Sequence, residues 1–327
     1  MSRVSDMHVP SVNREAAKIV KEICNNPDKY NVIIERSNLG AYVIDAGVKA
    51  EGGFLVGELI TRICLGGLGE TYLSLIQMGG MQFPLINVYT DYPSTSTLGS
   101  QMAGWKIKVG EYTAMGSGPA RALALKPKNI YEKINYRDES SEAVIVLETS
   151  KKPPEEAIKV IADSCRITPE NLFVIVTPTS SIAGLTQVSG RIIEVGMYKL
   201  VELGLDPKIV LYAFGQAPIL PVHPNDIESM GRANDSILYG GSAYYILSHP
   251  DDEYLKGIVE EAVSSASKDY GKTFAEIFRE SGQDFYKIDP KIFAPAKITI
   301  VNKKTGKTFT AGRVDVKILL RSIGLSL

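Results

Sequence analysis

The chain has 327 residues, of which 44% are hydrophobic and 22% charged, so it can bury a full core and is not intrinsically disordered. Its 36 lysines and arginines balance 37 aspartates and glutamates, and the formal net charge of -1 argues against a general nucleic-acid binder. The length predicts two domains or one large one, and no apolar run approaches the ~20 residues that span a bilayer.

The cysteines and the start of the chain point to a cytoplasmic protein. Cys24, Cys64 and Cys165 are odd in number and far apart, which is typical of free thiols in a reducing compartment. Residues 1–10 are polar and lack the apolar stretch of a secretion signal. We therefore expect a cytoplasmic protein with no membrane partner.

Both ends of the chain predict a β-hairpin. Residues 11–26 predict a helix capped by Ser11 or Asn13, and residues 32–45 then read as two alternating strands around a turn. Residues 298–310 repeat this pattern around Lys304-Thr305-Gly306. The similarity suggests that the two termini share one domain, although two ordinary hairpins can also match by chance.

The middle of the chain alternates strands and helices. We expect strands at residues 143–147, 172–176 and 209–214, and helices at residues 153–165, 187–203, 251–264 and 272–281. Such alternation predicts βαβ units on a buried sheet. The expected fold is α+β, with two domains and a substrate cleft between them. Our division places residues 1–90 plus 270–327 in the first domain and residues 91–269 in the second.

Residues 116–124 (GSGPARALA) are a candidate anion site. Gly116, Ser117 and Gly118 allow successive backbone N–H groups to point toward one ligand, and Arg121 adds a forked cationic donor. A phosphate or carboxylate of the substrate fits this pattern. A tight turn with Arg121 in a structural ion pair fits it equally well.

Two further segments carry chemistry. Residues 178–184 follow a predicted strand, where ligands commonly bind in α/β sheets, and Ser180 and Ser181 can bond a ligand or cap the next helix. Arg191 and Glu194 lie three residues apart on one helix face. Spacing alone favours an exposed ion pair. Their position after the serine loop favours a carboxylate base that an arginine holds ionised.

Metal and serine-nucleophile chemistry have little support in the sequence. His8, His223 and His249 stand alone, without another histidine or cysteine at ligand spacing, and no Gly-x-Ser-x-Gly motif occurs. We therefore expect no metal site. A hydrolytic reaction would need a substrate that is already electrophilic.

Nine segments together resemble the methenyltetrahydromethanopterin cyclohydrolase family of archaea. They run in order along nearly the whole chain: residues 11–16 (SVNREA), 88–91 (VYTD), 103–110 (AGWKIKVG), 114–127 (AMGSGPARALALKP), 178–182 (PTSSI), 189–191 (SGR), 267–272 (SKDYGK), 285–290 (FYKIDP) and 293–296 (FAPA). Tyr92 and Met102 depart from the family pattern, in which many members carry His and Lys there.

The resemblance implies a cyclohydrolase that interconverts 5,10-methenyl- and 5-formyltetrahydromethanopterin in methanogenesis or its reverse. It implies a homotrimer without a cofactor, with the pterin as substrate. The family's Arg-x-x-Glu pair falls on Arg191 and Glu194, as the positioning residue and the general base. We further assign substrate binding to Thr90, Asp91, Gln187 and Lys268, with Lys272 as an alternative to Lys268, beside the glycine and serine segments above. The open alternatives are a non-catalytic pterin-binding protein and a tetrahydrofolate cyclohydrolase.

Overall fold

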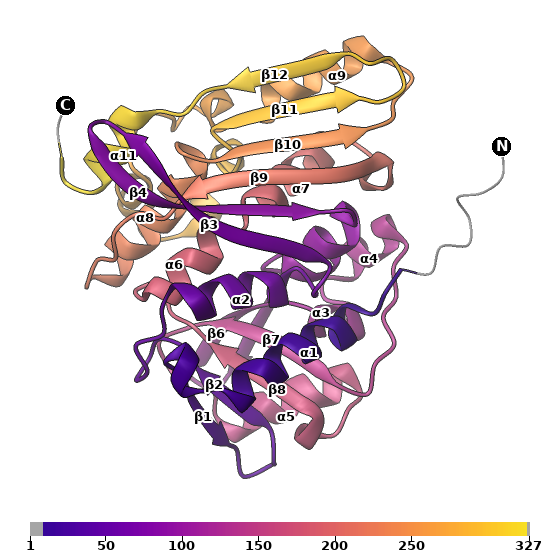
Figure 1. Ribbon diagram of the computed structural model, residues 1–327, viewed down its shortest axis with the longest axis vertical. Helices are drawn as coiled ribbons and strands as arrows, with labels where there is room; N and C mark the ends of the chain where they lie inside the picture. Colours follow the sequence, from indigo (N-terminus) through magenta and orange to yellow (C-terminus); the bar gives the residue numbers. More distant parts are fainter. Residues whose placement is uncertain (1–8, 326–327) are drawn as a thin grey trace.

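The computed structural model describes residues 9–325, except for the side chain of Tyr286, so His8 lies outside the described part. Its strands form two six-stranded mixed sheets, which lie one above the other in Figure 1. The α+β class that the sequence predicts is therefore confirmed. Helices cover both faces of the lower sheet and one face of the upper sheet.

The lower sheet has the strand order β1-β2-β8-β7-β6-β5. The strands are β1 (Ile33–Arg36), β2 (Tyr42–Asp45), β8 (Leu172–Val176), β7 (Ala143–Glu148), β6 (Tyr112–Ser117) and β5 (Trp105–Val109). The three central strands β2, β8 and β7 are parallel, and the outer pairings are antiparallel. One face packs against α1 (Val12–Asn25) and α2 (Phe54–Cys64), and the other against α3 (Ala120–Ala124) and α5 (Glu155–Cys165).

Several predicted elements of this half are confirmed because local signals specify them. The Ser11 hydroxyl accepts a hydrogen bond from the Arg14 amide and caps α1, as expected for an N-cap serine. β1 and β2 form the predicted hairpin, and β7, α5 and β8 form a parallel βαβ unit. β7 and β8 are continuous apolar runs, which a sheet covered on both faces requires.

The upper sheet has the strand order β12-β11-β10-β9-β4-β3. The strands are β12 (Thr308–Gly312), β11 (Lys297–Asn302), β10 (Ser242–Leu247), β9 (Val210–Pro218), β4 (Met81–Thr90) and β3 (Gly69–Met78). Its core includes α4 (Lys128–Ile134), α7 (Ile192–Glu202), α9 (Asp252–Glu261) and one side of α8 (Asp226–Leu238). The other side of α8 forms a separate cluster with α10 (Phe274–Glu280) and α11 (Val316–Ser322). The predicted hairpin near the C-terminus and the two predicted helices before it are confirmed as β11–β12, α9 and α10.

The distribution of strands between the sheets differs from two expectations. β9 pairs antiparallel with β4 and β10, so it is not a third parallel strand beside β7 and β8. The two terminal hairpins lie in different sheets, and our division at residues 90 and 270 does not follow the sheets, because residues 69–90 join the upper one. Strand pairing is a non-local choice, which periodicity along the chain does not encode.

The long helix expected at residues 187–203 is two helices, α6 (Ile182–Ser189) and α7. The chain breaks at Gly190 and Arg191. A Cβ atom at Gly190 would lie 2.4 Å from Thr61 Cγ2 of α2, so only glycine allows this close approach. Glycine also weakens a helix at that point.

The described residues contain three free cysteines, of which Cys64 and Cys165 are buried and Cys24 is half-buried. Within residues 9–325, no helix combines the length and the apolar character that crossing a bilayer requires.

Candidate functional site

The carboxyl ends of β7 and β8 face the helices α8 and α10 of the upper sheet. The segment that follows β8 turns sharply at Pro178, and Ser181 caps α6 by accepting a hydrogen bond from the Gly184 amide. The turn is tight, since a Cβ atom at Gly184 would lie 1.9 Å from the Pro178 carbonyl oxygen. Ser180 lies half-buried beside this cap. The predicted loop therefore lies where parallel sheets commonly bind ligands.

Arg191 is the centre of a buried polar cluster and is only 6% exposed. Its Nη1 donates to the Gln101 carbonyl oxygen at 2.6 Å, and its Nη2 donates to Ser117 Oγ at 2.9 Å. Nε and Nη2 both donate to Gln187 Oε1, at 3.2 and 2.9 Å. The π-helical segment η2 (Ser94–Gln101), β6 and α6 thus fix one guanidinium from three directions.

Two amide atoms next to Arg191 have no hydrogen-bond partner in the part of the chain that the structure describes. They are Gln101 Oε1 and Gln187 Nε2, and both side chains are fully buried. A buried polar atom without a partner costs about 1–3 kcal/mol. These atoms are therefore suited to bind a buried water molecule. That Gln187 binds substrate stays a prediction, because its side chain is fully buried.

Glu194 lies in the first turn of α7 and is 7% exposed. Among the described residues, no group donates a hydrogen bond to its carboxylate. Burial raises the pKa of Glu194, and the charges of Arg191 and Arg121 offset this only in part. A carboxylate with a raised pKa and free lone pairs is suited to general-base catalysis near neutral pH.

We expected Arg191 to position Glu194 and to keep its pKa low enough for the carboxylate to stay ionised. The charge of Arg191 lowers that pKa, although burial has the larger effect and leaves it above its ordinary value. Among the described residues no hydrogen bond joins the two side chains, since the Arg191 donors bond Gln101, Ser117 and Gln187. The simple exposed ion pair is also excluded, because both side chains are buried.

Arg121 and the glycine segment do not form an open anion site. Gly116 and Ser117 are the last residues of β6, and Gly118 follows in a turn. Arg121 is 0% exposed, and its Nη1 donates to the carbonyl oxygens of Leu98 and Ser100. Arg121 thus supports the π-helical segment and acts on Glu194 only through its charge, while Ser117 contributes directly by binding Arg191.

The remaining predicted residues make no hydrogen bond to Arg191 in the described part of the chain. Thr90 is buried at the end of β4, where its hydroxyl donates to the Leu68 carbonyl oxygen, and Asp91 is exposed after it. Lys268 is exposed near Asp289, and Lys272 pairs with Glu280. The structure does not bring these four residues to Arg191.

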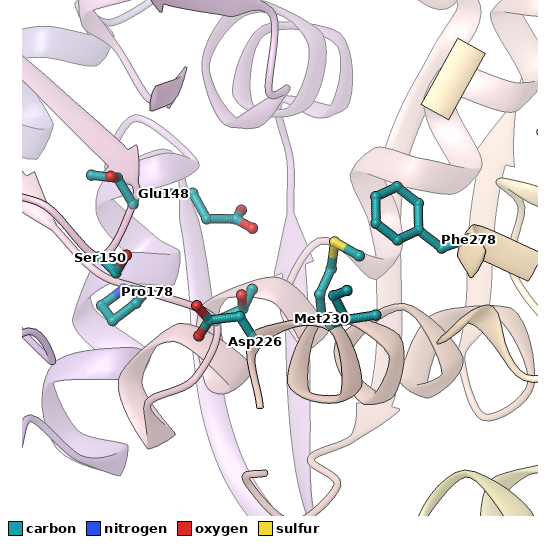
Figure 2. A pocket seen from close by; sticks show the side chains of 9 residues that line it. Glu148, Ser150, Pro178, Asp226, Met230 and Phe278 are labelled. Carbon is teal, nitrogen blue, oxygen red and sulfur yellow. The ribbon is translucent and has the colours of Figure 1, made fainter. Parts of the chain in front are cut away.

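Glu148 is a candidate site residue that the sequence analysis missed. It is the last residue of β7 and lines a cavity between the two sheets together with Pro178 and Asp226. Burial raises its pKa, and Arg191 is the cation that offsets this effect. Figure 2 shows its carboxylate directed into the cavity. Its place at the carboxyl end of a predicted buried strand was the signal that could have identified it.

Within the described part of the chain, no group of three His, Cys, Asp or Glu side chains is arranged to hold a metal ion. His223 and His249 lie on different loops, before α8 and after β10.

Comparison with known proteins identifies close relatives. Residues 11–323 match the family described as Cyclohydrolase (MCH). The chain is 45% identical to the methenyltetrahydromethanopterin cyclohydrolase of Methanothermobacter marburgensis, over 96% of this chain and 99% of that protein. It is 44% identical to the proteins of the same name from Methanocaldococcus jannaschii and Methanococcoides burtonii, in both cases over 96% of this chain and 98% of the relative.

Proposed function

The chain belongs to the methenyltetrahydromethanopterin cyclohydrolase family of hydrolases, and we propose that it interconverts 5,10-methenyl- and 5-formyltetrahydromethanopterin, with Glu194 as general base. The observation that carries the assignment of the base is the buried, unbonded carboxylate of Glu194 beside the fixed guanidinium of Arg191. Arg191 and Glu194 also stand at the Arg-x-x-Glu spacing expected for the family.

The substrate supplies its own electrophile. Its methenyl carbon lies between two nitrogens that share a positive charge. Water attacks this carbon, a C–O bond forms, and Glu194 accepts one water proton. The C–N10 bond then breaks as Glu194 returns this proton to N10. The new hydroxyl loses its proton to solvent, which leaves a formyl group on N5 and releases one proton per turnover.

Arg191 acts as a positioning residue, although it makes no hydrogen bond to Glu194 among the described residues. It holds Gln101 and Gln187, whose free Oε1 and Nε2 atoms are suited to bind a buried water molecule beside the reacting pair. Its charge also opposes the effect of burial on Glu194. Preorganised polar groups of this kind lower the barrier because they need no reorganisation during the reaction.

The experiment that tests this function follows the ultraviolet absorbance of methenyltetrahydromethanopterin mixed with the purified protein. We expect rapid decay with the wild-type protein and at least about 100-fold slower decay with Glu194→Gln, because general-base catalysis contributes about 10²–10⁴-fold. Glu260→Gln, at an exposed position on α9, is the matched control and is expected to keep wild-type activity.

Each other outcome has a definite meaning. A loss of less than about threefold in the decay rate of Glu194→Gln would show that Glu194 is not the general base and has only a structural role. No decay with the wild-type protein would favour either a non-catalytic pterin-binding protein or a cyclohydrolase that acts on tetrahydrofolate. The same assay with methenyltetrahydrofolate distinguishes these two, because only the second would hydrolyse it.

We also propose a cytoplasmic homotrimer without a bound cofactor. The exposed aromatic side chains Tyr89, Phe214 and Tyr244 on the upper sheet support contact between copies, because such patches commonly mark interfaces. Light scattering coupled to gel filtration measures the mass of the assembly.

A further inference from the structure

The cavity that Glu148 borders has an unusual balance of charge. Its volume is about 210 Å³, and it lies between the loops after β7 and β8 and the helices α8 and α10. Its lining consists of Glu148, Thr149, Ser150, Pro178, Thr179, Asp226, Ile227, Met230 and Phe278. Among the described residues, two carboxylates line it and no lysine, arginine or histidine does.

The carboxylates and the apolar side chains occupy different parts of this cavity. Figure 2 shows Glu148 and Phe278 on opposite sides, with Asp226 and Met230 along the bottom. Asp226 is the first residue of α8, where the helix dipole stabilises a negative charge. A flat ligand with delocalised positive charge fits this combination, since its faces contact apolar groups and its charge meets carboxylates.

Glu148 connects the cavity to the reacting pair. The charge of Arg191 acts on both Glu148 and Glu194, so one buried cation lies near two carboxylates. A second positive charge, brought by a ligand, is therefore attracted to this region.

We propose that Glu148 and Asp226 select the cationic substrate over its neutral ring-opened product. This inference rests on the proposed function, which makes the substrate a monocation and the formyl product neutral at the reacting centre. Ring opening removes the positive charge, so the attraction is lost when the product forms. The same carboxylates thus strengthen substrate binding and favour product release.

The test compares two ligands that differ in charge. The Michaelis constant for methenyltetrahydromethanopterin and the inhibition constant of the 5-formyl product are measured for wild type, Glu148→Gln and Asp226→Asn. We expect each substitution to raise the Michaelis constant about tenfold and to change the product constant by less than about twofold, because only the cation loses a Coulomb interaction. Added salt should weaken substrate binding less in the variants than in wild type.

The matched control is Glu253→Gln, in the first turn of α9, which packs on β11 and β12 and does not line the cavity; it should change neither constant. Equal weakening of both ligands, or no change in either, would overturn the proposal. Thermal unfolding of each variant identifies a loss of folding, and Asp226→Asn repeats the test at an exposed position where folding is not at risk. A wild-type protein without turnover would reject the proposed reaction separately, and dissociation constants from calorimetry would then replace the kinetic constants.

Discussion

The stability of the protein is expected to depend on one buried carboxyl group, Asp235 on α8. It is 0% exposed. Its Oδ1 accepts from the Phe274 amide at 2.8 Å and its Oδ2 accepts from Ser322 Oγ at 2.6 Å, so it links α8 to the start of α10 and the end of α11. Burial raises the pKa of Asp235 from 3.8 to about 7.

This raised pKa makes the folded state less stable as the pH rises. Below about pH 4 the carboxyl is protonated in both states and contributes no difference. Between about pH 4 and 7 the unfolded chain loses the proton while the folded protein retains it, so the free energy of unfolding falls with rising pH. Above about pH 7 the full effect of about 4 kcal/mol is present, because each pKa unit is worth about 1.4 kcal/mol.

The variant Asp235→Asn removes this charging step and keeps both hydrogen bonds. Its oxygen can accept from Phe274, and its amide can donate to Ser322 Oγ. We expect it to equal wild type near pH 4 and to exceed it by up to about 4 kcal/mol at pH 8. Urea unfolding followed by circular dichroism at four pH values measures the free energy of unfolding of both proteins. The contributions of the other titrating groups cancel in the difference between them.

Asp163→Asn is the control, because its exposed carboxylate pairs with Lys159 alone. We expect its difference from wild type to stay below about 1 kcal/mol at every pH. The reasoning would be refuted if the gain of Asp235→Asn were independent of pH or grew toward acid.

Two further predictions concern the active site. The value of kcat/KM should fall as the pH drops through the raised pKa of Glu194. Arg191→Met should move this acid limb to higher pH, because the charge of Arg191 lowers that pKa. An unchanged pH profile in Arg191→Met would show that the arginine does not act on the base. Gly190→Ala should cost about 1–3 kcal/mol of stability and reduce kcat, because its Cβ meets Thr61 Cγ2. Thr61→Ala in the same chain should restore much of both, as measured by thermal unfolding and turnover, and a double variant as impaired as the single one would contradict the steric explanation.

Local signals in the sequence determined the type and position of most elements. Ser11 caps α1 as expected, and the apolar runs of β7 and β8 with α5 between them specify a parallel unit. The capping box expected of a helix start appears where Thr273 and Glu276 begin α10. These features depend on neighbours within a few residues, so a single sequence contains them.

The sequence also selected Arg191 and Glu194, through their spacing and a family resemblance. The sequence could not determine their surroundings. Arg191 bonds Gln101 and Ser117, which lie 90 and 74 residues away along the chain. The hydrogen-bond partners of Arg191 therefore differ from Glu194, the partner that the helix spacing suggests.

Tertiary structure alone decided which strands share a sheet, which polar groups are buried and which carboxylates meet. β9 pairs with β4 across more than a hundred residues, Arg121 is enclosed rather than exposed, and Glu148 faces the cavity with Asp226. The physical reason is common to all three. Strand pairing, desolvation and the electrostatic field at a carboxylate each sum contributions from segments distant in sequence, whereas periodicity and capping report only on neighbours along the chain.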